Sequence, residues 1–468
     1  MGIAGSGMSA AALIAQAQGY RVSGCDLEPE GYYSQPLKKH KIEIALGHSQ
    51  EHLMDIDILV VSPAILEVTP HYPELIEAKK RKMVMTWQEF MGKYLQKDKF
   101  VIAVAGTHGK STTTAMVGLV LEAAGLDPTV EVGALVPQWQ SNARVGKSRY
   151  FVCEADEYHH NFLHYSPSIA IINNIDMDHP EFFKDFESFL AAFEKFIRKL
   201  VKPKILIVNL DDAGVRSLLE KNKHYLIKKR VPVIGYRLGA EYKFPLENEY
   251  RAEIKELGQD SSLFAVSLKS GFEQKAEIKE LFRLKLAAPH QIANSLGVIA
   301  VARCLNVNLD RVHQVFRTFE GIGRRQELLG EARGVKVIDD YGHHPTAITA
   351  VIKATRQKFP KARIWAVFEP HQFSRVKVFQ EAFNKALNLA DKVIVTKIFP
   401  GREKPLPEVS GELLIKKINS SKAKYEENFE TVAEIVVQGA RQEDVVLVFG
   451  AGKSYQLSRM ILEKLRTR

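Results

Sequence analysis

Cysteine is scarce in this sequence, and apolar runs long enough to cross a membrane are missing. The three cysteines, Cys25, Cys153 and Cys304, lie far apart among apolar neighbours. An odd, unclustered set argues against a disulfide framework or a zinc site and favours a reducing compartment. No apolar run approaches the ~18 residues of a membrane span, and no basic region precedes the first apolar stretch. We therefore expect a cytoplasmic protein without a signal peptide or membrane insertion.

A module that combines basic and aromatic residues for nucleic-acid binding is also missing. The net charge is +10, which by itself suits a nucleic-acid partner or a polyanionic small substrate. The lysines are spread along the chain, however, and local clusters at 79–82 and 228–230 fall at predicted helix ends, where basic residues are favoured anyway. We therefore predict a solvated basic surface and no nucleic-acid partner. The sequence sets no oligomeric state.

The overall composition is that of a large globular protein. The chain has 468 residues, of which 46% are hydrophobic and 26% charged. At ~100–200 residues per domain, this length predicts three domains, and alternating strand and helix patterns predict the α/β class. We expect a Rossmann-like N-terminal domain (1–97), a central P-loop ATPase α/β domain with a small antiparallel sheet (98–321) and a Rossmann-like C-terminal domain (322–468).

The segment FVIAVAGTHGKSTTT at 100–114 has the pattern of a phosphate-binding loop. Residues 101–105 predict a buried strand, 106–110 a turn, and Ser111 the start of a helix. The amides of the turn and the positive end of the helix would face phosphates, Lys110 adds a cation, and the Ser111 hydroxyl suits Mg²⁺. Val104 stands where the usual pattern has glycine. The alternative is an ordinary strand–turn–helix with an exposed lysine.

Acidic residues and a histidine follow the next two predicted strands. The predicted strand RYFVC (149–153) is followed directly by EADE, which begins at Glu154. The predicted strand IAIINNI (169–175) is followed by DMDH, which ends at His179. Carboxylates beside a phosphate loop are the usual second support for Mg²⁺. His179 is a candidate for a second metal ion or a phosphate. The alternatives are a solvated acidic loop and a structural histidine.

The sequence predicts half of a nucleotide-binding βαβ unit in the N-terminal region and a βαβ-type domain in the C-terminal region. Gly2, Gly5 and Gly7 lead into an alanine-rich helix, and Asp26 ends the next strand. The strand that should precede these glycines is missing, which predicts a start further upstream or a truncated record. In the C-terminal region, strands end at DDYGHHP (339–345) and EPHQFSR (369–375). Arg375 in the second motif is a candidate clamp for a carboxylate.

Taken in order, these motifs resemble the Mur ligase family. The matching stretches span nearly the whole chain, and in this family the leading glycine of the phosphate loop is not part of the pattern, so Val104 fits. The stretches are GSGM (5–8), AGTHGKSTTT (105–114), EADE (154–157), NIDMDH (174–179), GIGRR (321–325), DDYGHHPT (339–346) and FEPHQFSR (368–375).

The resemblance implies an ATP-dependent ligase that needs Mg²⁺ and joins L-alanine to the carboxylate of UDP-N-acetylmuramate through an acyl phosphate. It implies that Lys110, Glu154, His179 and Arg325 are catalytic and that Ser111, Glu154 and His179 hold metal. The implied nucleotide contacts are Gly106, Thr107, His108, Gly109, Lys110, Ser111, Thr112, His290, Asn294, Arg325, Asp340, Tyr341 and His343. The implied substrate contacts are Ser6, Gly7, Met8, Ser62, Ala64 and Arg375.

Three alternatives to this function remain open. A related ligase attaches a recycled tripeptide to UDP-N-acetylmuramate, and the VFEP and TWQEF stretches are somewhat similar to it. A basic, nucleic-acid-binding ATPase would combine the phosphate loop with the net charge. A degenerate UDP-sugar binder without catalysis would explain the incomplete N-terminal unit.

Overall fold

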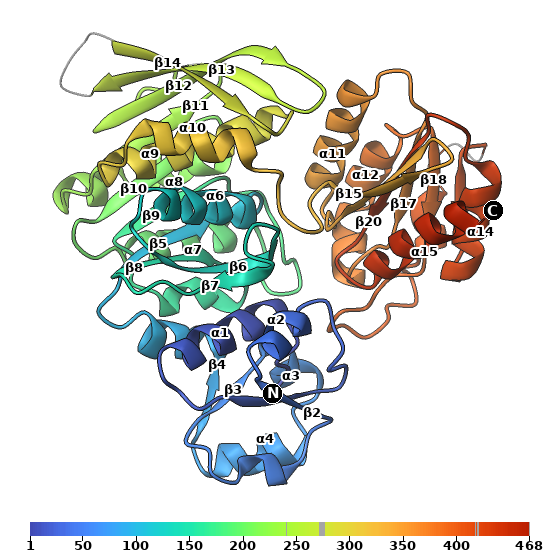
Figure 1. The fold of residues 1–468 in the computed structure, drawn as a ribbon, viewed down its shortest axis with the longest axis horizontal. Helices are drawn as coiled ribbons and strands as arrows, with labels where there is room; N and C mark the ends of the chain where they lie inside the picture. The colour runs from blue at the N-terminus through green and yellow to red at the C-terminus, as the bar shows by residue number, and fades with distance from the viewer. Residues whose placement is uncertain (240, 271–276, 417, 419–420, 468) are drawn as a thin grey trace. The chain divides into compact units, whose positions relative to one another are not determined.

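The computed structural model describes residues 1–239, 241–270, 277–416, 418 and 421–467. The chain forms two compact units (Figure 1). The first contains residues 1–177, 184–257 and 261–322, and the second contains residues 178–183, 258–260 and 323–468. The short segment Asp178–Phe183 therefore belongs to the same unit as the C-terminal region, although most of its sequence neighbours belong to the first unit.

The N-terminal part of the first unit has two parallel strand pairs. β1 (Ser23–Asp26) pairs with β2 (Glu43–Leu46), and β3 (Leu59–Val61) pairs with β4 (Val84–Thr86). No strand precedes α1 in the part of the chain that the structure describes. The first residues nevertheless join the pairs, because the Met1 amine donates to the Val60 carbonyl at 2.8 Å and the Gly2 amide donates to the Cys25 carbonyl at 2.8 Å.

Short helices complete this region. They are α1 (Ser6–Ala17), α2 (Ser34–Lys39), the 3-10 turn η1 (Gln50–Leu53), α3 (Pro63–Val68), α4 (Pro73–Lys80), α5 (Trp87–Phe90) and the π-helical turn η2 (Met91–Leu95). Proline begins both α3 and α4, where its missing N–H costs no hydrogen bond. The helices α1 and α3 both begin beside the first residues of the chain, so their N-termini lie at one edge of this region.

A ten-stranded mixed sheet forms the centre of the first unit, in the order β14-β13-β12-β11-β10-β9-β5-β8-β6-β7. β5 lies between β8 and β9, parallel to both, and its residues 101–105 are fully buried. Such a continuous apolar run is typical of a parallel strand covered on both faces. The strand bounds are β5 (Phe100–Ala105), β6 (Thr129–Val136), β7 (Ser141–Arg144), β8 (Tyr150–Ala155), β9 (Ile169–Ile172), β10 (Ile205–Asn209), β11 (Val233–Arg237), β12 (Asn248–Leu257), β13 (Ser262–Ser270) and β14 (Glu277–Leu284).

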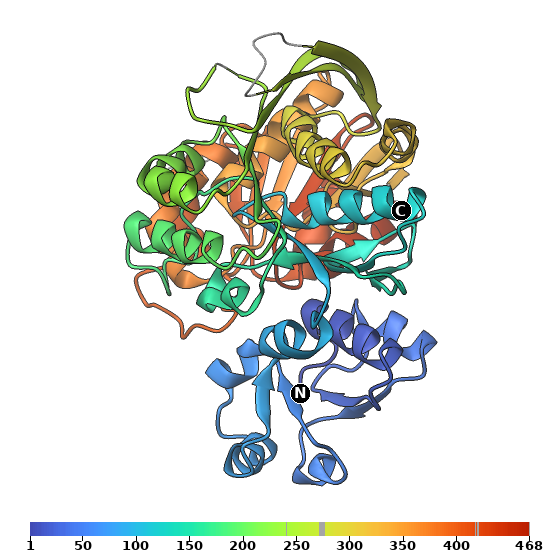
Figure 2. The ribbon, with the colours of Figure 1, turned by 90° about the vertical axis from the view of Figure 1, so that its left-hand side faces the viewer.

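The predicted small antiparallel sheet is part of this same central sheet. β12 pairs in parallel with β11 and antiparallel with β13, which pairs antiparallel with β14. The helices α6 (Lys110–Ala123), α9 (Pro289–Cys304) and α10 (Leu309–Thr318) pack together on one face. The helices α7 (Phe186–Ile197) and α8 (Ala213–Lys228) lie on the other face (Figure 2).

The second unit has a six-stranded sheet with helices on both faces, in the order β15-β16-β20-β17-β18-β19. All pairs are parallel except β15–β16, so the carboxyl ends of β16, β17 and β20 share one edge. The bounds are β15 (Glu327–Ala332), β16 (Val335–Asp340), α11 (Pro345–Lys358), β17 (Ile364–Phe368), α12 (Phe373–Leu387), β18 (Lys392–Val395), α13 (Gly411–Ile415), β19 (Ala423–Tyr425), α14 (Phe429–Gly439), β20 (Val445–Phe449) and α15 (Ser454–Thr467).

These arrangements confirm the predicted α/β class. The covered parallel strands of both units bury their apolar residues against helices, as a doubly wound sheet requires. None of the helices among the described residues is long and apolar enough to cross a membrane.

Candidate active site

The phosphate-loop pattern forms the connection from β5 to α6. The helix begins at Lys110, one residue earlier than predicted, and Gly109 precedes it in a left-handed conformation with φ of 81°. A β-carbon at Gly109 would lie 2.7 Å from Oδ1 of Asn294, so glycine is needed for both conformation and space. Ser111 and Thr112 follow in the buried first turn. The first amides of α6 therefore point into the loop, the usual geometry for binding phosphate.

Two asparagines after β9 hold this loop in place. Asn174 accepts from the His108 amide at 2.8 Å and donates to the His108 carbonyl at 3.0 Å. The Thr107 hydroxyl donates to the Asp176 carbonyl at 2.7 Å. Asn173 donates to the Thr113 hydroxyl at 3.0 Å, one turn into the helix. The loop is thus fixed by the neighbouring strand end before any ligand binds.

Lys110 lies within the loop and contacts an acidic residue. Its ammonium donates to the Gly106 carbonyl at 2.5 Å and to the Glu157 carboxylate at 2.9 Å. Burial lowers the pKa of Lys110, but Glu157, Asp156 and Glu154 outweigh burial and raise it overall. The lysine therefore carries a full positive charge, as a group that binds phosphoryl oxygens must.

The carboxylate of Glu154 lies at the end of β8, beside a second carboxyl group on β6. Glu154 accepts a hydrogen bond from the Gly133 amide, and its own amide donates to Glu131 at 3.2 Å. Burial, followed by the nearby Glu154 carboxylate, raises the pKa of Glu131 well above its usual range. Burial and the neighbouring carboxylate therefore both favour the protonated form of Glu131.

The residues suited to Mg²⁺ divide between the two units. Ser111 and Glu154 supply a hydroxyl and a carboxylate in the first unit, and such oxygen ligands fit Mg²⁺. His179 belongs to the second unit. There its amide donates to Asp178 at 2.8 Å, its Nδ1 lies 3.2 Å from Glu181, and its φ of 56° is left-handed. The metal-binding role of all three residues stays a prediction.

The first two turns of α9 (Pro289–Cys304) supply the two predicted contacts for the nucleotide, His290 and Asn294. Asn294 lies against Gly109 of the phosphate loop, as the close approach at that glycine shows. Burial, followed by the positive field of His108, lowers the pKa of His290 to about 4. His290 is therefore a neutral imidazole at pH 7, able to donate or accept a hydrogen bond without adding charge.

The predicted sugar-nucleotide contacts lie at the first turns of α1 and α3. Ser6 begins α1, and its carbonyl accepts from Asn142 of the central sheet at 2.6 Å. A β-carbon at Gly7 would lie 2.3 Å from the Trp87 ring. Met8 follows in the same turn, whereas Ser62 precedes α3 and Ala64 lies in its first turn. These five residues thus belong to two neighbouring helix starts.

Four predicted nucleotide contacts of the second unit gather at the end of β16. The guanidinium carbon of Arg325 lies 5.0 Å from the Tyr341 ring centre. Asp340 accepts from the Gly342 amide at 2.7 Å, and His343 Nδ1 lies 3.1 Å from the Tyr341 carbonyl. Burial raises the pKa of Asp340 against the opposing effect of Arg325. The second unit therefore presents a cation, a carboxyl group and an aromatic ring together.

The guanidinium of Arg375 binds a carboxylate of the protein itself. Its Nε and Nη2 donate to Asp178 Oδ1 at 2.9 and 2.8 Å, and its Nη1 donates to Gln372 at 2.6 Å. The residue is 1% exposed. Burial raises the pKa of Asp178, but Arg375 and nearby histidines bring it well below its usual range. Arg375 thus binds a carboxylate as the predicted clamp would, and in this structure that carboxylate is the side chain of Asp178.

Three family descriptions match consecutive parts of the chain. The catalytic domain of the Mur ligase family matches residues 1–98, the Mur ligase middle domain matches 104–302, and the Mur ligase glutamate ligase domain matches 324–452. Together these matches extend over more than half of the sequence. The chain belongs to the Mur ligase family.

Named relatives of this Mur ligase match it along nearly its whole length. The UDP-N-acetylmuramate–L-alanine ligase of Caldicellulosiruptor saccharolyticus is 36% identical, covering 99% of this chain and 98% of the relative. The ligase of the same name from Alkaliphilus metalliredigens is 37% identical, with 99% and 96% covered. The crystal structure of the UDP-N-acetylmuramate-alanine ligase MurC of Thermotoga maritima is similar at a TM-score of 0.79 and 26% identity, covering 100% and 98%.

Several residues that shape the sites of this Mur ligase were missed in the sequence. Asn174 and Asp178 lie inside the NIDMDH motif, so their spacing from His179 was a usable signal. Glu157 ends the EADE motif in the same way. Glu131 gave a weaker signal, an acid inside the apolar strand TVEVGALV. Asn173 gave no signal in the sequence, because its contacts with α6 and with Tyr236 join distant parts of the chain.

Proposed function

We propose that this Mur ligase joins L-alanine to the carboxylate of UDP-N-acetylmuramate in peptidoglycan precursor synthesis, at the expense of ATP. The observation that carries this proposal is the similarity, over at least 99% of the chain, to relatives named for that reaction. The phosphate loop of the central sheet supports the use of ATP. Because the substrates are a nucleotide-linked sugar and ATP, we place the reaction in the cytoplasm.

The proposed reaction has two steps. The muramoyl carboxylate attacks the γ-phosphorus of ATP, the bond to the leaving ADP breaks, and an acyl phosphate forms. The amino group of L-alanine then attacks the acyl carbon and loses a proton, which gives a tetrahedral intermediate. This intermediate expels inorganic phosphate and leaves the amide. Both steps develop negative charge on oxygen, which fixed donors and cations stabilise best.

The phosphate loop carries out the first step in this proposal. Gly106, Thr107, His108, Gly109 and Thr112 contact the phosphates of ATP, while Lys110 moves from Glu157 to the γ-phosphoryl group. His290 and Asn294 position the nucleotide from α9. Ser111 and Glu154 hold Mg²⁺, and His179 holds a second ion. Bound Mg²⁺ supplies neutralisation of the charge on the transferring phosphoryl group.

The remaining predicted residues bind the two acceptors or complete the nucleotide site. Ser6, Gly7 and Met8 present backbone to the diphosphate of the UDP-sugar, and Ser62 and Ala64 line the same site. Arg325, Asp340, Tyr341 and His343 are further nucleotide contacts in this proposal. Arg375 pairs with the carboxylate of L-alanine once Asp178 releases it, since guanidinium and carboxylate match in two parallel hydrogen bonds.

The test is phosphate release by the purified chain with UDP-N-acetylmuramate, ATP, Mg²⁺ and a panel of amines. We expect release with L-alanine that stops when any one component is left out. Release with the tripeptide and not with L-alanine would move the chain to the recycling ligases. Stimulation by nucleic acid alone would support the basic ATPase, and no turnover at all would support a degenerate binder.

Lys110→Ala provides the internal control of this assay. Loss of the cation should lower phosphate release by at least ~10²-fold, the size typical of one electrostatic contact to a transition state. Lys199→Ala removes an exposed lysine outside the loop and should leave the rate unchanged. Equal rates in wild type and Lys110→Ala would exclude the loop as the phosphoryl donor site.

A further inference from the structure

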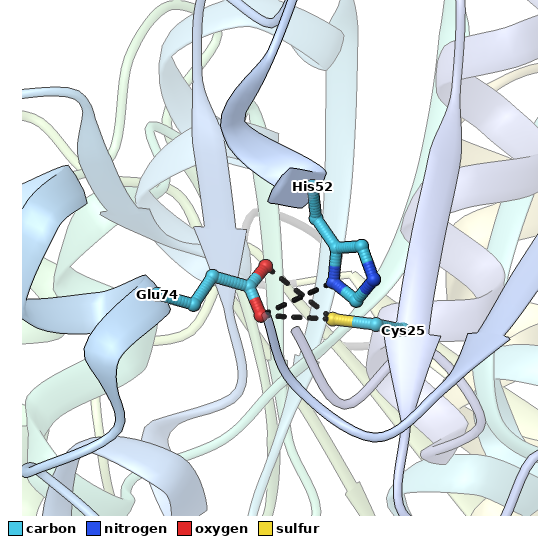
Figure 3. Close-up of side chains that lie close together, drawn as sticks. All are labelled: Cys25, His52 and Glu74. Carbon is cyan, nitrogen blue, oxygen red and sulfur yellow. Dashed lines mark hydrogen bonds and ion pairs between the residues drawn. The ribbon is translucent and has the colours of Figure 1, made fainter. Parts of the chain in front are cut away.

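The N-terminal region gathers four metal-ligating side chains that the proposed ligase reaction does not use. Cys25 lies on β1, His48 follows β2, His52 lies on η1 and Glu74 lies in the first turn of α4. Figure 3 shows the thiol of Cys25 and the ring of His52 both directed at the carboxylate of Glu74. A sulfur, an imidazole and a carboxylate from three separate segments thus lie within 4.8 Å of one another, and His48 lies beside the sulfur.

The distances in this cluster are those of ligands around a small tetrahedral ion. The Cys25 sulfur lies 3.4 Å from each Glu74 oxygen, and His52 Nδ1 lies 3.4 Å from Glu74 Oε2. His48 Nδ1 lies 3.1 Å from the sulfur and 3.6 Å from Glu74 Oε2. Zn²⁺ bonds of about 2.0–2.3 Å place neighbouring tetrahedral ligands about 3.3–3.8 Å apart, so the separations of 3.4–3.6 Å fit and His48 needs only a small shift away from the sulfur.

The burial of the cluster separates it from a chance gathering on the surface. Glu74 is 1% exposed and Cys25 is 2% exposed, and the His48 side chain is 2% exposed. A buried carboxylate is unfavourable unless a cation or several hydrogen bonds compensate it. The His52 side chain is 28% exposed, which gives an ion a route from solvent.

We propose that Cys25, His52 and Glu74, with His48 as the fourth ligand, form a structural Zn²⁺ site in the N-terminal region. Thiolate, imidazole and carboxylate together suit Zn²⁺ and disfavour Mg²⁺, which prefers oxygen ligands alone. The small number of unclustered cysteines predicts no zinc site. That prediction misses this cluster, because only one of its proposed ligands is a cysteine. The ion would tie β1, the segment after β2 and α4 together, next to Asp26, which accepts from the Ala4 amide at 2.9 Å.

Binding of the ion must release the thiol proton. Burial, reinforced by the neighbouring Glu74 carboxylate, raises the pKa of the Cys25 thiol to about 12. Without an ion, the sulfur is therefore protonated at neutral pH. The thiolate that Zn²⁺ requires forms only as the ion binds and the proton passes to solvent.

The test is a Co²⁺ titration of the chelator-treated full chain, followed by displacement with Zn²⁺. We expect one Co²⁺ per chain, a thiolate-to-cobalt charge-transfer band, and loss of that band when Zn²⁺ is added. Cys25→Ser should abolish the band, and Cys304→Ser, which removes a half-buried cysteine elsewhere, should keep it. His52→Ala should weaken Co²⁺ binding at least about tenfold, the scale known for lost support of a metal ligand.

A second measurement covers variants that fold poorly. Zn²⁺ should raise the thermal transition temperature of wild type and of Cys304→Ser, and should leave that of Glu74→Gln unchanged, because binding only to the folded state stabilises it. No charge-transfer band in wild type, or the same band in Cys25→Ser, would overturn the site. Neither readout uses ATP or a UDP-sugar, so failure of the proposed ligase activity would be a separate result.

Discussion

Gly109 and Asn294 lie so close together that a β-carbon at Gly109 would stand 2.7 Å from Oδ1 of Asn294. These two residues are 185 positions apart in sequence, yet the phosphate loop and α9 approach each other here. Asn173 approaches the same position, with its Nδ2 3.1 Å from that β-carbon. Three segments of the chain therefore determine the shape of the loop.

Replacement of Gly109 by alanine should impair nucleotide binding more than folding. The left-handed backbone costs alanine about 1–2 kcal/mol, and the contact with Asn294 also displaces the loop. Gly125→Ala is the matched control, since Gly125 has φ of 72° with nothing within 4 Å of its β-carbon. Calorimetric ATP binding and thermal unfolding separate the two effects. Equal ATP affinity in both variants would contradict the account.

The two carboxyl groups Glu131 and Glu154 should respond differently to amidation. Glu154→Gln should lower turnover by at least ~10²-fold, because it removes the carboxylate proposed to hold Mg²⁺. Glu131→Gln should change turnover little, because burial and Glu154 favour the neutral form of Glu131, which the amide imitates. Initial rates against Mg²⁺ concentration provide the measurement. A large loss in Glu131→Gln with a small loss in Glu154→Gln would reverse the assignment.

The buried pair of Asp178 and Arg375 should matter far more for stability than an exposed pair of similar length. Asp178→Asn leaves a buried guanidinium without its counter-charge, which costs about 3–5 kcal/mol. Glu408→Gln disrupts the exposed pair of Lys377 and Glu408, at 2.9 Å, and should have little effect. Thermal unfolding of both variants at pH 7 measures the contrast, and similar transition temperatures would count against it.

Ionisation of the buried Glu369 carboxyl group should lower the free energy of unfolding as the pH rises. Burial raises the pKa of Glu369 from 4.5 to about 7, so the folded state binds more protons than the unfolded state between these values. Stability therefore falls through this window as the pH increases, by up to about 3 kcal/mol. The pKa of Asp339 is also raised, to about 6, and acts in the same direction.

The variant Glu369→Gln isolates this contribution. Its transition temperature, relative to wild type, should increase from about pH 5 to about pH 8, because the amide has no proton to lose. The contribution of Asp339 is common to both proteins and cancels in the difference. A difference that stays constant with pH would show that Glu369 ionises normally in the folded state.

Local patterns in the sequence were sufficient for the parts of the fold that depend on neighbouring residues. The buried strand β5, the glycine turn and the following helix were predicted from 15 consecutive residues, 100–114, with an error of one residue at the helix start. The covered sheets followed from alternating strand and helix patterns. In both cases the hydrophobic period and the turn residues determine the structure directly.

Long-range relationships could not be predicted in the same way. The carboxyl groups of Glu131 and Glu154 meet because β6 pairs with β8, a register that no local pattern gives. Asp178 and Arg375 are 197 residues apart, and the grouping of Asp178–Phe183 with the second unit depends on such contacts. Likewise, the small antiparallel sheet was predicted, but its connection to the parallel strands through β11 and β12 was not, because strand patterns do not identify the partner of an edge strand.

The most direct test of the proposed ligase reaction uses UDP-N-acetylmuramate labelled with oxygen-18 in its carboxylate, together with ATP and L-alanine. If an acyl phosphate forms and L-alanine displaces it, mass spectrometry should find one labelled oxygen in the released phosphate and one in the new amide carbonyl. Unlabelled phosphate, or labelled phosphate without a product heavier by one alanine residue, would contradict the account.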